Sequence, residues 1–384
     1  MSEIKVNSIK GVGANVAAIS INNANGTCTA NITNNLSNRN KVINGGMMVH
    51  QRGDASATGS SAYLSCDRFF TSNGSAGQVA VTKSTDTPDG FGASTKWDCT
   101  TADTSIAAGD YFLIQHRIEG QNIQDFEKGD TSAKQFAVSF YIKATKTGVY
   151  TVELEDLDNN RGCSKTITVS NTNWNRYSII FPADTTGAFD NDNALSLSLN
   201  FWLLAGSTFN SGTLQSSAWG TLTNANRVSS SNVNALDSTS NDFFLTGVQL
   251  EVGGVVTNFE HRSYAQELAL CQRYCQVLGG NTSQELFMYA TGNGTGTATG
   301  FYQAPVDFRT TPSFSISNLS HVNIYNFTNS GNLGSPSSMN LITAMSAKHW
   351  IYIDSPISNC TSGGGIMVRA NSTTDARFIL TAEL

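Results

Sequence analysis

Apolar and polar residues alternate along many short segments between residues 42 and 259. One run places five apolar side chains at every second position, with polar residues and Trp202 between them: Leu195, Leu197, Leu199, Phe201 and Leu203. The same period of two recurs at residues 111–118, 136–143, 150–156, 165–170 and 176–183. Because successive side chains of a strand point to opposite faces of a sheet, each run predicts a strand with one buried face. No helical pattern separates these runs, so the sequence predicts an all-β fold with a large β-sandwich of the jelly-roll type.

The polarity of the chain comes from uncharged residues. Charged residues make up only 14% of the chain, and 34 glycines accompany many Ser, Thr and Asn residues. Such residues suit strand faces and tight turns, as in an extended structural protein. The net charge is −6 and no basic stretch is present, which argues against a surface that neutralises phosphates. We therefore expect no binding to nucleic acid.

The cysteines and the apolar segments indicate where the chain is made. The 7 cysteines are scattered and odd in number, which does not suggest a disulfide framework. The N-terminus lacks the apolar core of a signal peptide, and no segment approaches the roughly 20 apolar residues of a membrane helix. We expect synthesis in a reducing cytoplasm and no membrane insertion.

The stretch from residue 242 to 278 predicts a strand followed by a helix. Five residues share one face of an extended chain: Phe244, Thr246, Val248, Leu250 and Val252. Ser263 and Gln266 have the spacing of a capping box, which marks the start of a helix. Apolar residues then recur at helical intervals as far as Cys275, so we predict a helix over 263–278.

These patterns divide the chain into four segments. Residues 1–40 hold short strand-like runs around Asn-Gly turns and too few large apolar residues for a core. We expect them to form an extended arm that pairs with neighbouring chains or with an anchoring protein. Residues 41–262 form the predicted jelly roll, and 263–278 form the linking helix. Strand-like runs such as 350–354 then return, which predicts a smaller β-sandwich over 279–384.

The acidic run from Glu153 to Asp158 raises two chemical possibilities. Glu153 and Glu155 share a strand face, as the two carboxylates of a glycosidase would. A calcium loop that starts at Asp156 fails in detail, because Arg161 occupies the position that needs glycine. We expect instead a solvated strand edge that leads into a hairpin turn.

Other catalytic and metal-binding patterns are weaker still. The 5 histidines are isolated, and neither HExxH nor GxSxG is present. Cys271 and Cys275 lie one helical turn apart without a second pair of ligands nearby, so we expect them to be buried helix residues. We therefore predict no enzymatic activity, no cofactor and no metal ion.

Aromatic residues near the C-terminus suggest a surface for sugars. Trp350, Tyr352 and Asp354 share one face of a predicted strand, and Tyr325 and Tyr302 lie on neighbouring segments. Sugar rings pack their C–H faces on Trp and Tyr, while their hydroxyls need polar partners such as Asp. We predict that these five residues bind a glycan. The alternative is that the rings pack inside this region or between subunits.

Several long blocks resemble one group of viral proteins. The blocks are VINGGMMVHQRG at 42–53, CDRFF at 66–70, IQHRIEGQN at 114–122, the stretch 245–274, FYQAPVDFRTTPSF at 301–314 and the terminal TAEL. They resemble tail-fibre-like virion proteins of tailed bacteriophages, especially those of marine and cyanobacterial phages. The resemblance covers most of the chain beyond residue 40.

The resemblance implies a structural virion protein that assembles as a homotrimeric fibre. It also implies a jelly roll similar to carbohydrate-binding modules, and it transfers no catalytic residues. Some modules of this kind hold a structural calcium ion near the first and last strands. Here Thr246 stands where an acidic ligand would be expected, so the resemblance does not lead us to predict this ion.

Three functions follow, in order of preference. The first is a phage tail fibre or receptor-binding protein, located in the virion, that attaches to host cell-surface polysaccharide and joins other virion proteins through residues 1–40. The second is an architectural head fibre, vertex or tail accessory protein without a ligand. The third, less favoured, is a polysaccharide depolymerase, because no repeat-rich groove presents two carboxylates.

Overall fold

The computed structural model describes residues 6, 8–9, 19–21, 28–30, 37–294, 296–327, 331–343, 345–357 and 362–384. The described part consists mainly of antiparallel strands, and its helices are short. The prediction of an all-β class is confirmed. Within the described residues, every helix is too short or too polar to span a bilayer.

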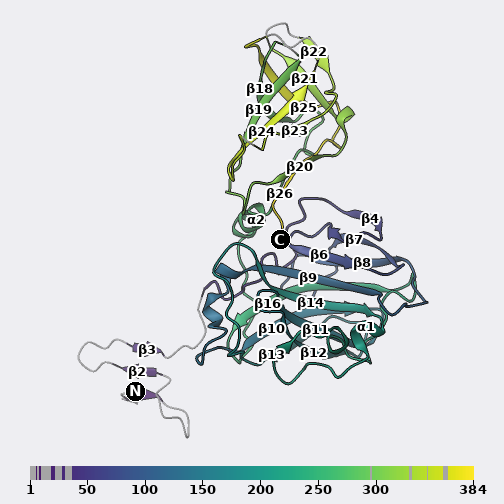
Figure 1. Cartoon of the computed structure of the whole chain (residues 1–384), viewed down its shortest axis with the longest axis vertical. Coiled ribbons are helices and arrows are strands. Elements are labelled where there is room, and N and C mark those ends of the chain that lie inside the picture. The colour runs from purple at the N-terminus through teal and green to yellow at the C-terminus, as the bar shows by residue number, and fades with distance from the viewer. Residues whose placement is uncertain are drawn as a thin grey trace, which may run out of the picture.

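Two large sheets pack face to face and form the large sandwich (Figure 1). The six-stranded sheet consists, in spatial order, of Asn175–Phe181 (β13), Phe136–Ala144 (β10), Asp242–Val252 (β16), Ser94–Thr101 (β8), Gln78–Ser84 (β7) and Ala55–Thr58 (β4). The seven-stranded sheet consists of Gly220–Thr221 (β15), Arg161–Val169 (β12), Gly148–Asp156 (β11), Leu195–Ala205 (β14), Tyr111–Glu119 (β9), Phe69–Asn73 (β6) and Ala62–Tyr63 (β5). Strands distant in sequence are neighbours in both sheets, as in a jelly roll.

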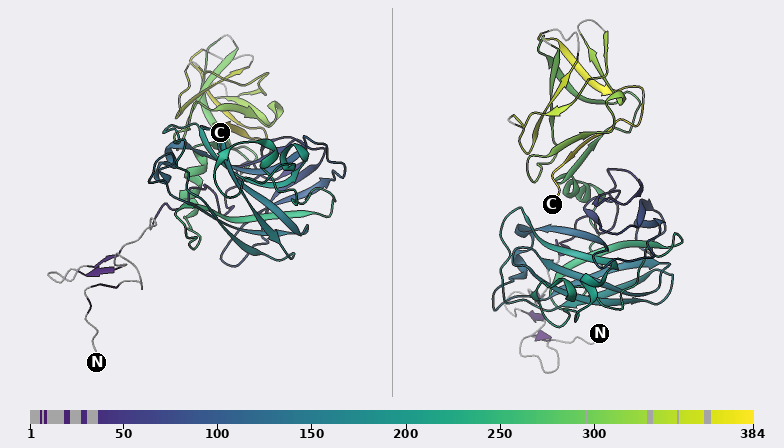
Figure 2. Two further views of the ribbon diagram at one scale, coloured as in Figure 1. Left: turned by 60° about the horizontal axis from the view of Figure 1, so that its bottom comes forward. Right: turned by 45° about the vertical axis from the view of Figure 1, so that its right-hand side comes forward.

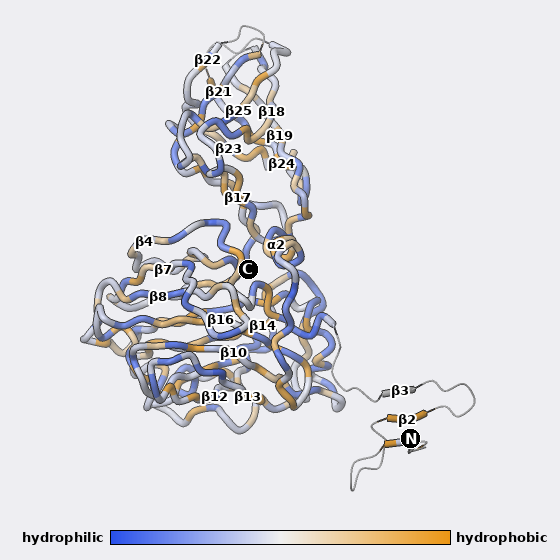
Figure 3. The backbone as a smooth tube through the Cα atoms, turned by 180° about the vertical axis from the view of Figure 1, so that it is seen from behind, coloured by the Kyte–Doolittle hydropathy of each residue, from blue (hydrophilic) through white to orange (hydrophobic). Residues whose placement is uncertain are grey.

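The core of the sandwich contains the apolar residues of the alternating runs. Leu197, Leu199 and Phe201 on β14 are buried between the two sheets. Figure 3 shows apolar segments along the sandwich strands with hydrophilic segments between them. The polar side of β14 is also covered, because residues 206–235 fold over the outer face of the seven-stranded sheet and bury Trp202. Two short helices, Ser207–Asn210 (α1) and Asn224–Asn226 (η3), lie in this covering segment.

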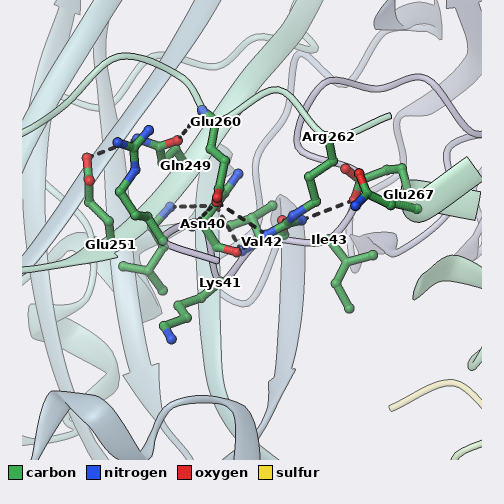
Figure 4. Close-up of polar contacts among 12 residues, drawn as sticks. Asn40, Lys41, Val42, Ile43, Gln249, Glu251, Glu260, Arg262 and Glu267 are labelled. Carbon is green, nitrogen blue, oxygen red and sulfur yellow. Dashed lines mark hydrogen bonds and ion pairs between the residues drawn. The ribbon is translucent and has the colours of Figure 1, made fainter. Parts of the chain in front are cut away.

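The chain enters the sandwich beside its last strand (Figure 4). The Asn40 amide donates to the carbonyl oxygen of Val248 (3.0 Å) and accepts from the backbone N–H of Leu250 (3.1 Å). Arg262 donates to the carbonyl oxygen of Asn40. The start of the sandwich, its closing strand β16 and the segment before the next helix are therefore held together by hydrogen bonds.

The linking helix is shorter than predicted. The helix α2 (Tyr264–Gln272) has the capping box expected at Ser263, but the prediction that it continues to residue 278 is wrong. Cys275–Leu278 is a strand (β17), because its backbone pairs with Phe378–Thr381 (β26) at the end of the chain. Pairing with a segment about 100 residues away outweighs the local helical spacing.

The C-terminal part, residues 275–384, contains two further sheets. The three-stranded sheet is formed by β17, β26 and Ser313–Ile316 (β20). The seven-stranded distal sheet consists, in spatial order, of Gly331–Gly334 (β22), Val322–Asn326 (β21), Gly365–Ala370 (β25), Leu286–Gly292 (β18), Thr297–Gln303 (β19), Trp350–Pro356 (β24) and Asn340–Leu341 (β23). The two sheets share a second hydrophobic core. This part projects from the large sandwich (Figure 2).

A buried ion-pair cluster joins the C-terminal part to the sandwich. Arg68, which is fully buried, lies over the ring of Tyr274 at 3.5 Å and pairs with Glu383. Arg52 pairs with the same carboxylate at 2.9 Å. Buried guanidinium groups are retained only when their charge is compensated, so Glu383 is integral to this joint.

Smaller elements complete the described chain. Ser8–Ile9 (β1), Ile19–Ile21 (β2) and Cys28–Ala30 (β3) form a separate three-stranded sheet. This sheet lies apart from the sandwich and away from the C-terminal part (Figures 1 and 2). The remaining short helices are Gly120–Asn122 (η1), Gln124–Phe126 (η2) and Leu319–His321 (η4).

Candidate functional site

Three of the five residues predicted to bind sugar lie on the outer face of the distal sheet. Tyr352 and Asp354 alternate on β24 with the buried residues Ile351 and Ile353. Tyr325 on β21 lies on the same outer face, where the guanidinium of Arg369 lies over its ring at 4.6 Å. The structure thus brings together Tyr325, Tyr352 and Asp354 from the predicted group.

The other two predicted residues are placed differently. Tyr302 points to the opposite face of the sheet, where its hydroxyl donates to Gln276 at 2.9 Å and its ring packs against the second core. Burial raises the pKa of the Tyr302 hydroxyl to about 12. The backbone of Trp350 pairs with Gln303, and its side chain lies outside the described residues.

The large sandwich also carries a cleft that was not predicted from the sequence. The cleft lies on the outer face of the seven-stranded sheet, beside the covering segment 206–235, and has a volume of about 370 Å³. Its lining includes Tyr111, Gln115, Arg117, Glu155, Phe209 and Arg227. The alternation of residues 111–118 already indicated the part of this lining that lies on β9, because it places Tyr111, Gln115 and Arg117 on the face away from the core.

A carboxylate network forms the floor of the cleft. Arg227 binds Glu153 through two nitrogens (2.8 and 2.9 Å) and Glu155 through one (2.7 Å). Asn200 donates to both carboxylates at 3.0 Å, and the indole N–H of Trp202 donates to Glu153 at 2.9 Å. The expectation of a solvated strand edge is wrong here, because the covering segment brings Arg227 over these strands and buries Glu153.

The network gives the cleft floor a fixed polar surface. Burial, together with the negative charge of Glu153, raises the pKa of Glu155. Arg227 opposes this shift by its own charge and hydrogen bond. Because one guanidinium and one amide hold both carboxylates, we interpret Glu153 and Glu155 as a scaffold for the cleft and not as a catalytic pair.

Aromatic rings and polar groups share the walls of the cleft. Tyr111 packs edge-on against Phe209, with ring centroids 5.7 Å apart. The Tyr111 ring passes so close to Gly74 that a Cβ there would lie 2.4 Å from it, so a larger residue at this position would displace the ring. Gln115 donates to Asn200 at 2.9 Å and accepts from Arg117 at 3.0 Å. Apolar ring surface beside fixed donors and acceptors is the chemistry that recognises a sugar.

The described residues contain no group of three or more His, Cys, Asp or Glu side chains that could hold a metal ion. Cys271 and Cys275, which invited a metal interpretation, are free and buried at the joint beside Arg68. Burial raises the pKa of both thiols, as expected for inert packing residues.

Comparisons with known proteins give structural neighbours but no sequence family. No protein-family model and no curated protein matches the chain. The enzymatically active domain of tailspike protein 4 from bacteriophage CBA120 is 16% identical, with a TM-score of 0.29; the match covers 56% of this chain and 21% of that chain. The carbohydrate-binding module CBM4 is 11% identical, with a TM-score of 0.31 and coverage of 55% and 99%.

A further neighbour is TmCBM61, solved in complex with β-1,4-galactotriose. It is 10% identical, with a TM-score of 0.29, and the match covers 56% of this chain and 99% of that chain. The neighbours thus include a phage tailspike domain and carbohydrate-binding modules. The identities and TM-scores of all three are low.

Proposed function

We propose that this protein is a bacteriophage tail fibre or receptor-binding protein that holds host surface glycans in the cleft of the large sandwich. The observation that carries the glycan part is the cleft itself, where the rings of Tyr111 and Phe209 stand beside Gln115, Arg117 and Glu155. The resemblance of the sequence blocks to tail-fibre-like proteins supports the virion part.

The arrangement of the chain supports attachment at one end and host contact elsewhere. The β1–β3 sheet lies away from the C-terminal part (Figure 1). Residues 1–40 join the protein to other virion proteins, and three chains assemble into a fibre on the tail or another surface appendage. The protein binds glycans without cleaving them, because Glu153 and Glu155 are both engaged by Arg227.

A binding experiment tests the cleft. Tyr111→Ala removes one ring of the wall, and Gln115→Ala, as a second variant, removes a polar partner. On an array of bacterial surface polysaccharides, each should weaken the binding seen with the unmodified protein about tenfold, or about 1.4 kcal/mol. Tyr141→Ala is the matched control, since Tyr141 is a half-buried tyrosine on the six-stranded sheet.

The outcomes separate the functions. Thermal unfolding confirms that each variant is folded before its binding is compared. Binding that survives both cleft variants would place the glycan outside the cleft. If the unmodified protein binds no polysaccharide, the architectural role without a ligand replaces this proposal. Shortened polysaccharide chains after incubation would instead indicate a depolymerase.

A further inference from the structure

We propose that the distal sheet carries a second polysaccharide site, separate from the cleft, on a row of outward-facing side chains made of four aromatic residues and one methionine. The row consists of Tyr325, Met367, Tyr289, Phe301 and Tyr352, and we call it the aromatic row. This inference rests on the proposed function in host contact, but it does not depend on the cleft.

Strand register builds the aromatic row. Tyr325 pairs with Met367, Met367 with Tyr289, Tyr289 with Phe301, and Phe301 with Tyr352. The five side chains therefore follow one another across five adjacent strands, from β21 to β24. Neighbouring strands lie about 4.8 Å apart, so the row extends over about 19 Å. A linear polymer that runs across the strands meets a side chain of the row at every strand.

The row faces solvent in the single chain. Tyr289 is 59% exposed and Phe301 is 49% exposed. Their neighbours along each strand, such as Ala290 and Ala298, are buried in the second core. Large apolar side chains exposed side by side mark an interaction site and not random surface variation.

A further ring broadens the middle of the row. Phe327 is 48% exposed and stacks on Tyr289, with ring centroids 6.1 Å apart and planes at 25°. Its ring passes over Gly365, where a Cβ would lie 3.4 Å from the ring. The apolar surface around Tyr289 is therefore wider than a single side chain.

Polar side chains border the row on both sides. On one side, Thr299 donates to Asp354 at 2.7 Å. On the other side, Gln303 is exposed and Arg369 is held between the Tyr325 ring and Gln284, to which it donates at 3.2 Å. One acidic and one basic residue balance each other, so the face suits an uncharged polymer. Rings flanked by such groups match the C–H faces and hydroxyls of a sugar chain.

The size of the row argues against a second copy of the chain as its occupant. A fully exposed aromatic side chain offers about 150–250 Å², and only Tyr289 and Phe301 are about half exposed, so the five side chains together offer less than about 500 Å². A stable protein interface needs about 800 Å² on each partner, with few polar groups at its centre. The narrow row with its polar borders fits a linear chain of sugars better.

Binding to defined polysaccharides tests the inference on the full chain. The probes are three unbranched neutral polysaccharides: a β-1,4-glucan, a β-1,3-glucan and an α-mannan. Affinity is measured by electrophoresis through gels that contain each polysaccharide. The double variant Tyr289→Ala/Phe301→Ala should lose at least about tenfold in affinity for a polysaccharide that retards the unmodified protein. Met345→Ala is the control, because Met345 is an apolar residue that is 53% exposed and outside the row.

The result that would refute the aromatic row as a site differs from the result that would refute the cleft as a glycan site. Unchanged affinity in the folded double variant, or no retardation of the unmodified protein by any probe, refutes the row as a site. Loss of affinity only in Tyr111→Ala would assign binding to the cleft alone and leave the proposed function intact. A change in oligomeric mass of the double variant, without loss of affinity, would identify the row as a subunit contact. The single variant Tyr352→Ala repeats the test if the double variant does not fold.

Discussion

At the scale of single residues, two arginines that are paired with carboxylates organise the parts of this protein that matter for function. Arg227 holds Glu153 and Glu155 on the cleft floor, and Arg68 holds Glu383 at the joint. A buried guanidinium is stable only beside compensating charge. The acidic pair was evident in the sequence, but its partner lies more than 70 residues away, so neither its burial nor its role could be predicted.

His50 makes stability depend on pH. Its Nδ1 lies 2.9 Å from the Ser65 hydroxyl and its Nε2 lies 2.9 Å from the Met47 carbonyl oxygen. Burial lowers the pKa of His50 from 6.5 to about 4. The unfolded chain therefore binds a proton at His50 more tightly than the folded protein does. The contribution of His50 to the free energy of unfolding is complete above pH 6.5 and is lost as the pH falls towards 4.

We expect His50 alone to account for a loss of about 2 kcal/mol in unfolding free energy between pH 7 and pH 5. Urea unfolding at the two pH values measures this loss. His50→Gln, which cannot take up the proton, should lose correspondingly less than the unmodified protein. His349→Gln provides the same substitution at a more exposed histidine. Equal losses in His50→Gln and the unmodified protein would contradict the assignment.

At the scale of elements, alternation with period two predicted the strands correctly, whereas the helical spacing did not predict where the helix ends. The alternating runs became strands of the large sandwich, including β9, β10 and β14. The capping box at Ser263 formed as predicted. Cys275–Leu278 left the helix because β26 offered a partner from the far end of the chain. A local pattern cannot show that a distant strand competes for the same backbone.

The start of α2 also anchors the chain where it enters the sandwich. Glu267, in the first turn of the helix, accepts from the backbone N–H of Asn44 (2.5 Å) and from Arg262 (3.3 Å). We expect Ser263→Ala, which removes the cap, to reduce the unfolding free energy by about 1 kcal/mol. Chemical denaturation measures this reduction.

The matched control is Ser132→Ala, an exposed serine in a loop of the sandwich. Ser263→Asp restores a capping acceptor and should recover most of the loss. A Ser263→Ala variant as stable as the unmodified protein would show that tertiary contacts, and not the cap, hold the helix start.

At the scale of the whole molecule, the proposed homotrimer explains the small sheet of β1, β2 and β3. Each of these strands has only two or three residues, and Ile9 is 53% exposed. Strands this short bury too little apolar surface to be stable alone. Neighbouring chains or a virion partner would supply the missing contacts.

Light scattering tests the assembly directly. We expect a mass three times the 41.0 kDa of one chain, and we expect removal of residues 1–36 to weaken the trimer. Removal of these residues leaves the contacts of Asn40 with β16 in place. The full chain measured as a stable monomer would count against the fibre.

The sequence by itself determined which residues face a core and which face away. Period two records that choice in each strand, because alternate side chains must point to opposite faces. It therefore determined the all-β class, the sandwich and the outward position of Tyr352 and Asp354. Only the tertiary structure decided strand order and register, which depend on hydrogen bonds between backbones far apart in the chain. That register aligned Tyr289 and Phe301 with Tyr352, placed Tyr302 on the other face, and brought Arg227 over the carboxylates of the cleft.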